Sequence, residues 1–205
     1  MTKMLCGKWL REGVGARMDV KTIAVIGAGD VGRGIAYVAA RSGYGTILED
    51  VSGPRLEKAT TWITQCFEQS VAGGTTEAII AARAAVANLT VARTVEDAIR
   101  DADLIIETLP DEMETQIELF TILDKFSKPN AIFAATGSIS ITELAEVTFC
   151  ADRCVGMRFS GRAAESQTIE LGKGSQTSAE TIAACSEVAR RMGKAVVMVS
   201  ESDYE

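Results

Sequence analysis

The sequence predicts an α/β fold: a mainly parallel, doubly wound sheet with a pair of helices inserted after the second strand. Short apolar runs rich in β-branched residues alternate with longer segments of helical periodicity, and this alternation is typical of a parallel sheet with helices on both faces. The first apolar run, residues 22–26, leads straight into a glycine-rich turn and then into a helical pattern. At 205 residues, the chain has the length of one such domain.

Each expected element is bounded by residues that favour its start or its end. Strands are expected over 22–26, 46–48, 89–91, 103–107, 131–134, 154–159, 167–171 and 195–199. Helices are expected from the glycine turn to Gly43 and over 54–70, 75–86, 95–100, 114–126, 141–147 and 178–192. Pro54 suits a first helical turn, and Ser140 with Glu143 forms a capping box. Gly43 and Gly193 stand where helices end.

Residues 1–19 fit no clear element. Proteins of this layout often begin just before the first strand, which is where Met18 stands. We therefore interpret the first residues as a leader, either appended to the domain or included by a mis-assigned start. The domain itself is expected to span residues 20–202.

The turn after the first strand has the spacing G-x-G-x-x-G, with glycines at positions 27, 29 and 32. Such glycines serve a tight turn, a close backbone approach to a pyrophosphate, and close packing of helix on strand. The start of the following helix offers unpaired N–H groups and a positive dipole end to the phosphates. Gly27, Gly29, Asp30, Val31 and Gly32 are therefore the candidate residues for binding a dinucleotide.

An acidic residue at the end of the second strand strengthens this interpretation. Asp50 follows Gly32 by 18 residues, close to where such folds place a carboxylate on the ribose 2′-hydroxyl. A carboxylate there repels a 2′-phosphate, so NAD is favoured over NADP. Arg55 would favour NADP, but it lies beyond the strand end, near the start of the next helix.

Composition excludes several other classes of function. The net charge is −7, with 28 acidic and 21 basic residues, which argues against a nucleic acid or an anionic membrane as the main partner. No apolar run approaches the roughly 20 residues of a membrane helix, and the N-terminus lacks a secretory apolar core. The cytoplasm is the expected compartment.

The five cysteines are scattered and histidine is absent, so no metal site is expected.

The assembled pattern resembles the NAD-binding domain of the 3-hydroxyacyl-CoA dehydrogenases, over roughly residues 21–202. Five segments carry the resemblance, in matching order and spacing: IAVIGAGDVGRGIA, LIIETLPDEMETQIELFTILD, IFAATGSISITELA, VGMRFSGRAAESQTIEL and RRMGKAVVMVSES. The resemblance implies hydride transfer between nicotinamide and C3 of a 3-hydroxyacyl thioester. A helical C-terminal domain, which in the family closes the substrate cleft and makes the dimer, is expected to be absent from this chain.

The family's catalytic histidine position is occupied by Arg158 in this chain, in the stretch GMRFSGR, where the family usually has G-[LM]-H-F-F-N-P. The glutamate that orients the histidine is retained as Glu170, twelve residues later, and the asparagine position is Gly161. A guanidinium stays protonated in proteins and cannot act as a base. The resemblance therefore implies a site that has lost its usual proton acceptor.

Two further site positions differ from the family. The serine that usually meets the substrate oxygen is Gly137, although Ser138 is adjacent. Asp111 keeps an acid after the fourth strand, and the cofactor-facing lysine of the next helix is Gln116. The candidate catalytic residues are accordingly Glu170, Ser138 and Arg158, with Asp111 and Gln116 counted toward the cofactor.

Three interpretations of function remain open at this point. The chain is a dinucleotide-binding protein with lost or weak dehydrogenase activity, a divergent NAD-dependent oxidoreductase with relocated acid–base groups, or a domain of a larger enzyme. Relocated groups would come from Glu107, Asp111, Ser138, Ser160 and Glu170. Arg158 either forms a salt bridge with Glu170 or, with Arg162, holds a substrate carboxylate or phosphate. An acyl-CoA or a carboxylate is the expected substrate class, and a homo-oligomer is expected to cover apolar surface.

Overall fold

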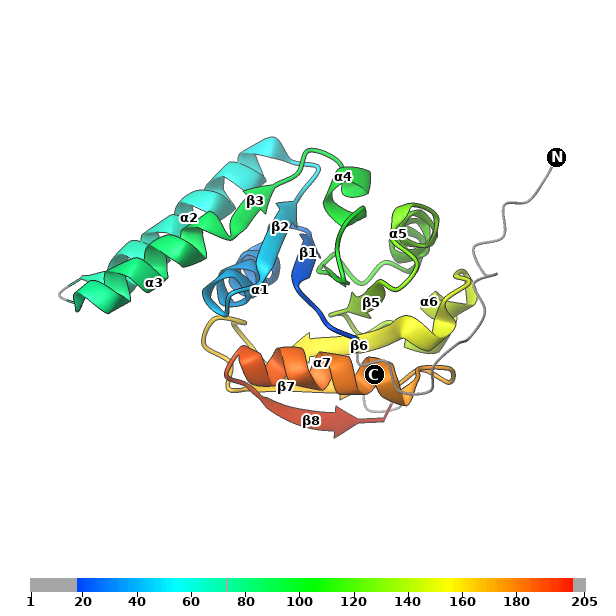
Figure 1. Cartoon of the computed structure of the whole chain (residues 1–205). Helices are drawn as coiled ribbons and strands as arrows, with labels where there is room; N and C mark the ends of the chain where they lie inside the picture. The colour runs from blue at the N-terminus through cyan, green and yellow to red at the C-terminus, as the bar shows by residue number, and fades with distance from the viewer. Residues whose placement is uncertain (1–17, 73, 201–205) are drawn as a thin grey trace.

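The computed structural model describes residues 18–72 and 74–200, so the predicted leader falls almost entirely outside the described residues. Eight strands form one sheet in the order β3-β2-β1-β4-β5-β6-β7-β8 (Figure 1). Neighbouring strands are parallel except β6 and β7, which are antiparallel. The predicted α/β class, with a doubly wound and mainly parallel sheet, is confirmed.

The element boundaries lie within one or two residues of the expected ones. The strands are β1 Thr22–Ile26, β2 Gly45–Glu49, β3 Leu89–Val91, β4 Leu104–Glu107, β5 Ile132–Ala135, β6 Cys154–Phe159, β7 Thr168–Gly172 and β8 Ala195–Val199. The α-helices are α1 Asp30–Arg41, α2 Gly53–Val71, α3 Thr76–Ala87, α4 Val95–Ile99, α5 Met113–Phe126, α6 Ile141–Glu146 and α7 Ala179–Arg191. A 3₁₀ turn over Ala151–Arg153, which the sequence reasoning missed, precedes β6.

Alternating side chains of the central strands feed two apolar cores, one on each face of the sheet. In β1, Ile23 and Val25 join the core that also contains residues of α1 and α7. Ala24 and Ile26 join the core that contains residues of α4, α5 and α6. This division is the consequence of a strand period of two in a sheet that is covered on both sides.

The inserted helices α2 and α3 form an antiparallel pair that projects from the body of the domain (Figure 1). The pair is anchored at its α2 side by Ile63 and Phe67, which are buried against the main core. The Tyr37 ring of α1 lies 4.8 Å from the Phe67 ring, centroid to centroid. The packing of α2 on α1 fixes the position of the first turn of α2 beside the end of β2.

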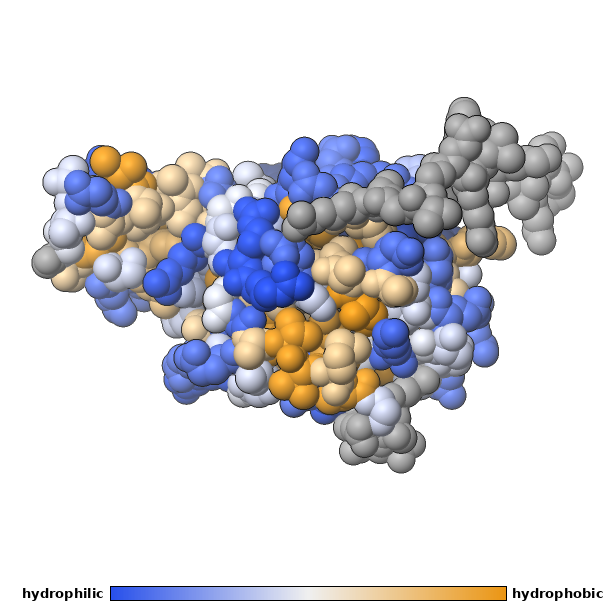
Figure 2. Space-filling model, turned by 60° about the horizontal axis from the view of Figure 1, so that its bottom comes forward, coloured by the Kyte–Doolittle hydropathy of each residue, from blue (hydrophilic) through white to orange (hydrophobic). Residues whose placement is uncertain are grey.

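The last strand, β8, forms one edge of the sheet and exposes apolar side chains. Val197 and Met198 are 44% and 49% exposed, and Figure 2 shows an apolar area on the part of the surface where β8 lies. Within residues 18–72 and 74–200, no helix has both the length and the apolar character needed to cross a membrane.

Candidate cofactor and active site

The glycine turn between β1 and α1 has the geometry that the motif predicts. Gly27 adopts φ +100°, and its N–H donates to the Glu49 carbonyl oxygen of β2 at 2.9 Å. A Cβ on Gly32 would lie 1.9 Å from the Gly27 carbonyl oxygen, so α1 packs directly on the turn. At Gly29, by contrast, no described atom outside its chain neighbours lies within 4 Å of a Cβ position. The turn is therefore packed against α1 at Gly32 and uncovered at Gly29, and a pyrophosphate would approach its backbone at Gly29.

The first turn of α1 supplies the side chains next to this open face. Asp30 is mostly exposed and pairs with Arg33 at 2.7 Å between Oδ1 and an arginine nitrogen. Val31 is 41% exposed. The α1 N-terminus thus presents backbone N–H groups beside one carboxylate that is already paired with a cation.

Asp50 lies against the glycine turn, as the sequence predicts, but its carboxylate is almost fully occupied. Oδ2 accepts from the Ala28 N–H and Oδ1 from the Ser52 N–H, both at 2.8 Å. Arg55 also reaches Oδ2, at 3.3 Å from its Nη1. Arg55 lies beyond the end of β2, in the first turn of α2, as expected; its side chain nevertheless reaches Asp50.

Two buried carboxyl groups flank the site, at the ends of β2 and β4. Burial raises the pKa of Glu49 to about 7, and the neighbouring charges of Asp50 and Glu96 add to the shift. Burial likewise raises the pKa of Glu107 to about 7, against the opposing effect of backbone N–H groups from Leu109 and Thr136. Near neutral pH, each of these groups is therefore divided between its neutral and its charged form.

Asp111 and Ser138 form the polar wall beyond β4 and β5. The Ser138 hydroxyl donates to Asp111 Oδ2 at 2.8 Å, and the Ser138 N–H donates to Oδ1 at 3.1 Å. The Asp111 carboxylate fills the space that a side chain at Gly137 would need. The serine position that the family resemblance places at 137 is thus taken up by a carboxylate.

Gln116 lies beneath this wall and is fully buried. Its Nε2 donates to the Pro110 carbonyl oxygen at 3.3 Å, and its Oε1 has no hydrogen-bond partner among the described residues. In this structure Gln116 therefore supports the loop after β4 and has no exposed surface of its own.

Arg158 and Glu170 face each other across the antiparallel strands β6 and β7. The two residues are partners in the strand register, and Arg158 Nε lies 3.3 Å from Glu170 Oε2, with each side chain 31% exposed. Ser160 Oγ lies 3.5 Å from the other Glu170 oxygen. This arrangement is the salt bridge that the sequence offered as one interpretation of Arg158.

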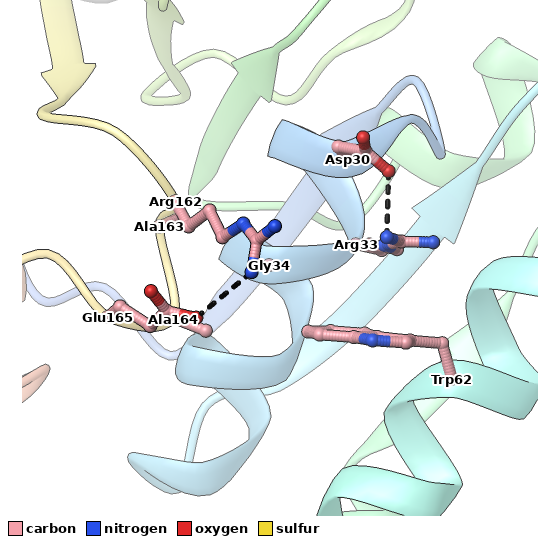
Figure 3. Close-up of a pocket in the computed structure, with 8 residues that line it drawn as sticks. All are labelled: Asp30, Arg33, Gly34, Trp62, Arg162, Ala163, Ala164 and Glu165. Atoms are coloured by element: carbon pink, nitrogen blue, oxygen red, sulfur yellow. Dashed lines mark hydrogen bonds and ion pairs between the residues drawn. The ribbon is translucent and has the colours of Figure 1, made fainter.

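Arg162 pairs with Glu165 at 3.4 Å. It lines a cavity of about 280 Å³ between the start of α1, α2 and the loop after β6 (Figure 3). On the opposite side of this cavity the Arg33 guanidinium lies 4.7 Å from the centre of the Trp62 ring. A joint carboxylate or phosphate site of Arg158 and Arg162 stays a prediction.

Sequence reasoning did not single out Arg33, Trp62 or Thr108 as residues of the site. Thr108 Oγ1 donates to the Ile26 and Gly27 carbonyl oxygens, at 3.0 and 3.1 Å, and so holds the turn against β4. Its position directly after a strand that ends in an acid was the available signal. Arg33 and Trp62 come from separate helices, and no local pattern connects them.

No group of three or more metal-ligating side chains occurs in the described part of the chain.

The fold and the glycine turn define a dinucleotide-binding domain of the Rossmann type. Residues 22–202 match the family described as 3-hydroxyacyl-CoA dehydrogenase, NAD binding domain. The chain belongs to this family, and NAD is the cofactor of its domain.

Relatives of known name agree with this assignment. A probable 3-hydroxybutyryl-CoA dehydrogenase of Bacillus subtilis is 32% identical over 186 residues, covering 90% of this chain and 64% of the relative. The human mitochondrial hydroxyacyl-coenzyme A dehydrogenase is 30% identical, over 87% of this chain and 58% of the relative. The crystal structure of (S)-3-hydroxybutyryl-CoA dehydrogenase from Ralstonia eutropha superposes with a TM-score of 0.82 at 29% identity, covering 89% of this chain and 64% of that chain. The chain thus spans about three fifths of the length of these proteins.

Proposed function

We propose that NAD binds across the glycine turn and that this chain has little or no dehydrogenase activity. When bound, NAD supplies the acceptor or donor of a hydride. Gly29 leaves room for the pyrophosphate, the α1 N-terminus stabilises its charge, and Asp50 stands beside the adenosine ribose. The fit is supported by the open face at Gly29 and by the closed packing behind it.

The observation that carries the loss of activity is the ion pair between Arg158 and Glu170. The resemblance places the family's proton-accepting histidine at position 158. An arginine there stays protonated, and in this structure it forms an ion pair with Glu170. Loss of a general base typically costs ~10²–10⁴-fold in rate. Glu170, which would orient a histidine, is neutralised by a cation that cannot take up a proton.

The substrate class that we propose for the site follows from the relatives, whose names refer to 3-hydroxybutyryl-CoA and hydroxyacyl-CoA. An acyl-CoA is therefore the first compound to test, with small hydroxy acids as the carboxylate alternative. A carboxylate would pair with Arg158 beside Glu170 or in place of it.

A second candidate function is a divergent NAD-dependent oxidoreductase with relocated acid–base groups. The hydrogen bond from Ser138 to Asp111 favours it, because it aligns a hydroxyl with a carboxylate near Glu107, the acid that ends β4. In such an enzyme the Ser138 oxygen would accept the proton of a substrate hydroxyl while passing its own proton to Asp111. Asp111→Asn would then abolish turnover, whereas an inactive binding protein has no turnover for the substitution to abolish.

The two candidates are separated by measuring binding and turnover on the same protein. NAD⁺ is titrated calorimetrically, and NADH oxidation is followed with acetoacetyl-CoA. We expect binding of NAD⁺ with negligible turnover. Gly29→Val is the matched control for the site, since it closes the open face, and it should abolish binding while the protein stays folded. Turnover near the median enzyme rate of ~10 s⁻¹ would overturn the inactive interpretation.

A further inference from the structure

The contact between Arg55 and Asp50 changes what the adenosine end of the cofactor site presents to a ligand. In a site selective for NAD, an accessible carboxylate accepts from the ribose hydroxyls and repels a 2′-phosphate. Here the Asp50 side chain is only 2% exposed, while that of Arg55 is 59% exposed. The outermost charged group of this pair is therefore a cation.

The Asp50 carboxylate is held in this inward position by its own hydrogen bonds. It accepts from the N–H groups of Ala28, in the glycine turn, and of Ser52, at the start of α2. A carboxylate has about four acceptor sites, and Arg55 occupies the third of them, after the two N–H groups. Asp50 thus joins the turn to α2 and has one acceptor site left for a ribose hydroxyl.

The start of α2 adds to the positive character around Arg55. Ser52 caps the helix through its hydroxyl, and the first turn of α2 contains no acidic residue. The helix N-terminus contributes its partial positive charge beside Arg55, and the carboxylate at this helix end is that of Asp50, which accepts from the Ser52 N–H. The buried Asp50 is the acid that balances Arg55, and it lies on the inner side of the guanidinium.

We propose that Arg55 is a specificity-determining residue that lets this site accept a 2′-phosphate, so that the chain binds NADP as well as NAD. This inference rests on the proposed cofactor site at the glycine turn. The planar guanidinium can hold a 2′-phosphate through paired hydrogen bonds while Asp50 stays bound to Ala28 and Ser52. With NAD, one ribose hydroxyl donates to the remaining acceptor site of Asp50. The same pocket then serves both cofactors, with Arg55 the residue that distinguishes them.

The test is a calorimetric titration of the protein with NAD⁺ and NADP⁺, together with 5′-AMP and 2′,5′-ADP. The last two differ only by the 2′-phosphate and reach only the adenosine end of the site. Arg55→Gln removes the cation, and Lys58→Gln removes a similar exposed charge one turn further along α2. Lys58→Gln should keep the thermal midpoint of the original protein, and Arg55→Gln retains a side-chain amide that can donate to Asp50.

We expect NADP⁺ to bind within about tenfold of NAD⁺. Arg55→Gln should weaken the binding of NADP⁺ and 2′,5′-ADP by roughly tenfold or more, because it removes a charge-assisted pair. The affinities for NAD⁺ and 5′-AMP should stay unchanged. Lys58→Gln should leave all four affinities nearly unchanged. Binding of NAD⁺ without NADP⁺, or equal losses in the two variants, would overturn the inference and leave the proposed function intact. If no ligand binds, the proposed cofactor site itself fails, and the inference fails with it.

Discussion

A Cβ atom on Gly137 would lie 1.8 Å from Oδ1 of Asp111, so a residue larger than glycine cannot stand at position 137 while the Asp111 carboxylate keeps its place. The Asp111 carboxylate is fixed there by the hydroxyl and the N–H of Ser138. Where the family resemblance places a serine, this chain has a glycine, and the carboxylate of Asp111 takes the space. The two positions are therefore coupled by steric exclusion.

This coupling predicts a non-additive effect on stability. Gly137→Ala should force the Asp111 carboxylate away from Ser138 and cost roughly 1 kcal/mol or more of unfolding free energy, the contribution of a lost hydrogen bond. In an Asp111→Ala background the same substitution should cost much less, because the obstructing oxygen is gone. Urea denaturation of the four proteins measures the difference. Gly53→Ala is the matched control, since a Cβ there meets open space, and equal costs in both backgrounds would contradict the steric argument.

The parts of the site that were predictable depend on local sequence, and the others depend on contacts between distant elements. Gly27, Gly29 and Gly32 lie within one turn, so their roles follow from spacing alone. The pairing of Arg158 with Glu170 was predictable because they lie on strands that the family resemblance fixes. The contact of Arg55 with Asp50 was not predictable, because it depends on how α2 packs on α1. The same holds for Asp111 and Gly137, whose contact joins loops after two different strands.

The buried carboxyl group of Glu107 predicts how stability changes with pH. Its pKa is raised from 4.5 to about 7 in the folded protein, so the folded state binds more protons than the unfolded state between these values. Stability should therefore decrease as pH rises from about 4.5 to about 7 and level off above that range. The full contribution of this one group is ~3 kcal/mol, to order of magnitude.

Glu107→Gln tests this directly, because an amide keeps the shape of the neutral acid and does not titrate. The unfolding free energy of the variant, measured by urea denaturation from pH 5 to pH 8, should fall less steeply with pH. A residual slope is expected, since the pKa of Glu49 is raised to about 7 as well. Glu118→Gln, on the exposed face of α5, serves as the control and should reproduce the original slope. A slope unchanged in Glu107→Gln would show that this group does not titrate in that range.

Arg158→His tests whether the site retains the rest of a catalytic arrangement. A histidine at this register position would face Glu170 and could accept the proton of a substrate hydroxyl during oxidation and donate it to the ketone oxygen during reduction. Oxidation of NADH with acetoacetyl-CoA should rise at least about tenfold above that of the original protein, the lower part of the range for general-base catalysis. Arg158→Gln, which removes the charge without adding a base, should stay at the original level. Equal rates in the two variants would mean that loss of the salt bridge, and not a new base, is responsible.

The exposed edge strand β8 predicts self-association. It is five residues long with only apolar side chains, and within residues 18–72 and 74–200 no strand pairs with its outer edge, so its backbone groups there can pair with another strand. A second copy of the chain suits it, because an antiparallel pair of identical edge strands matches itself around a twofold axis. Val197→Lys should therefore shift the protein toward the monomer in sedimentation velocity at several concentrations, since a charge on an edge strand opposes pairing. Ile80→Lys, at a 62% exposed position on α3, is the matched control and should sediment like the original protein. A monomeric original protein at high concentration would contradict the prediction, as would dissociation by Ile80→Lys alone.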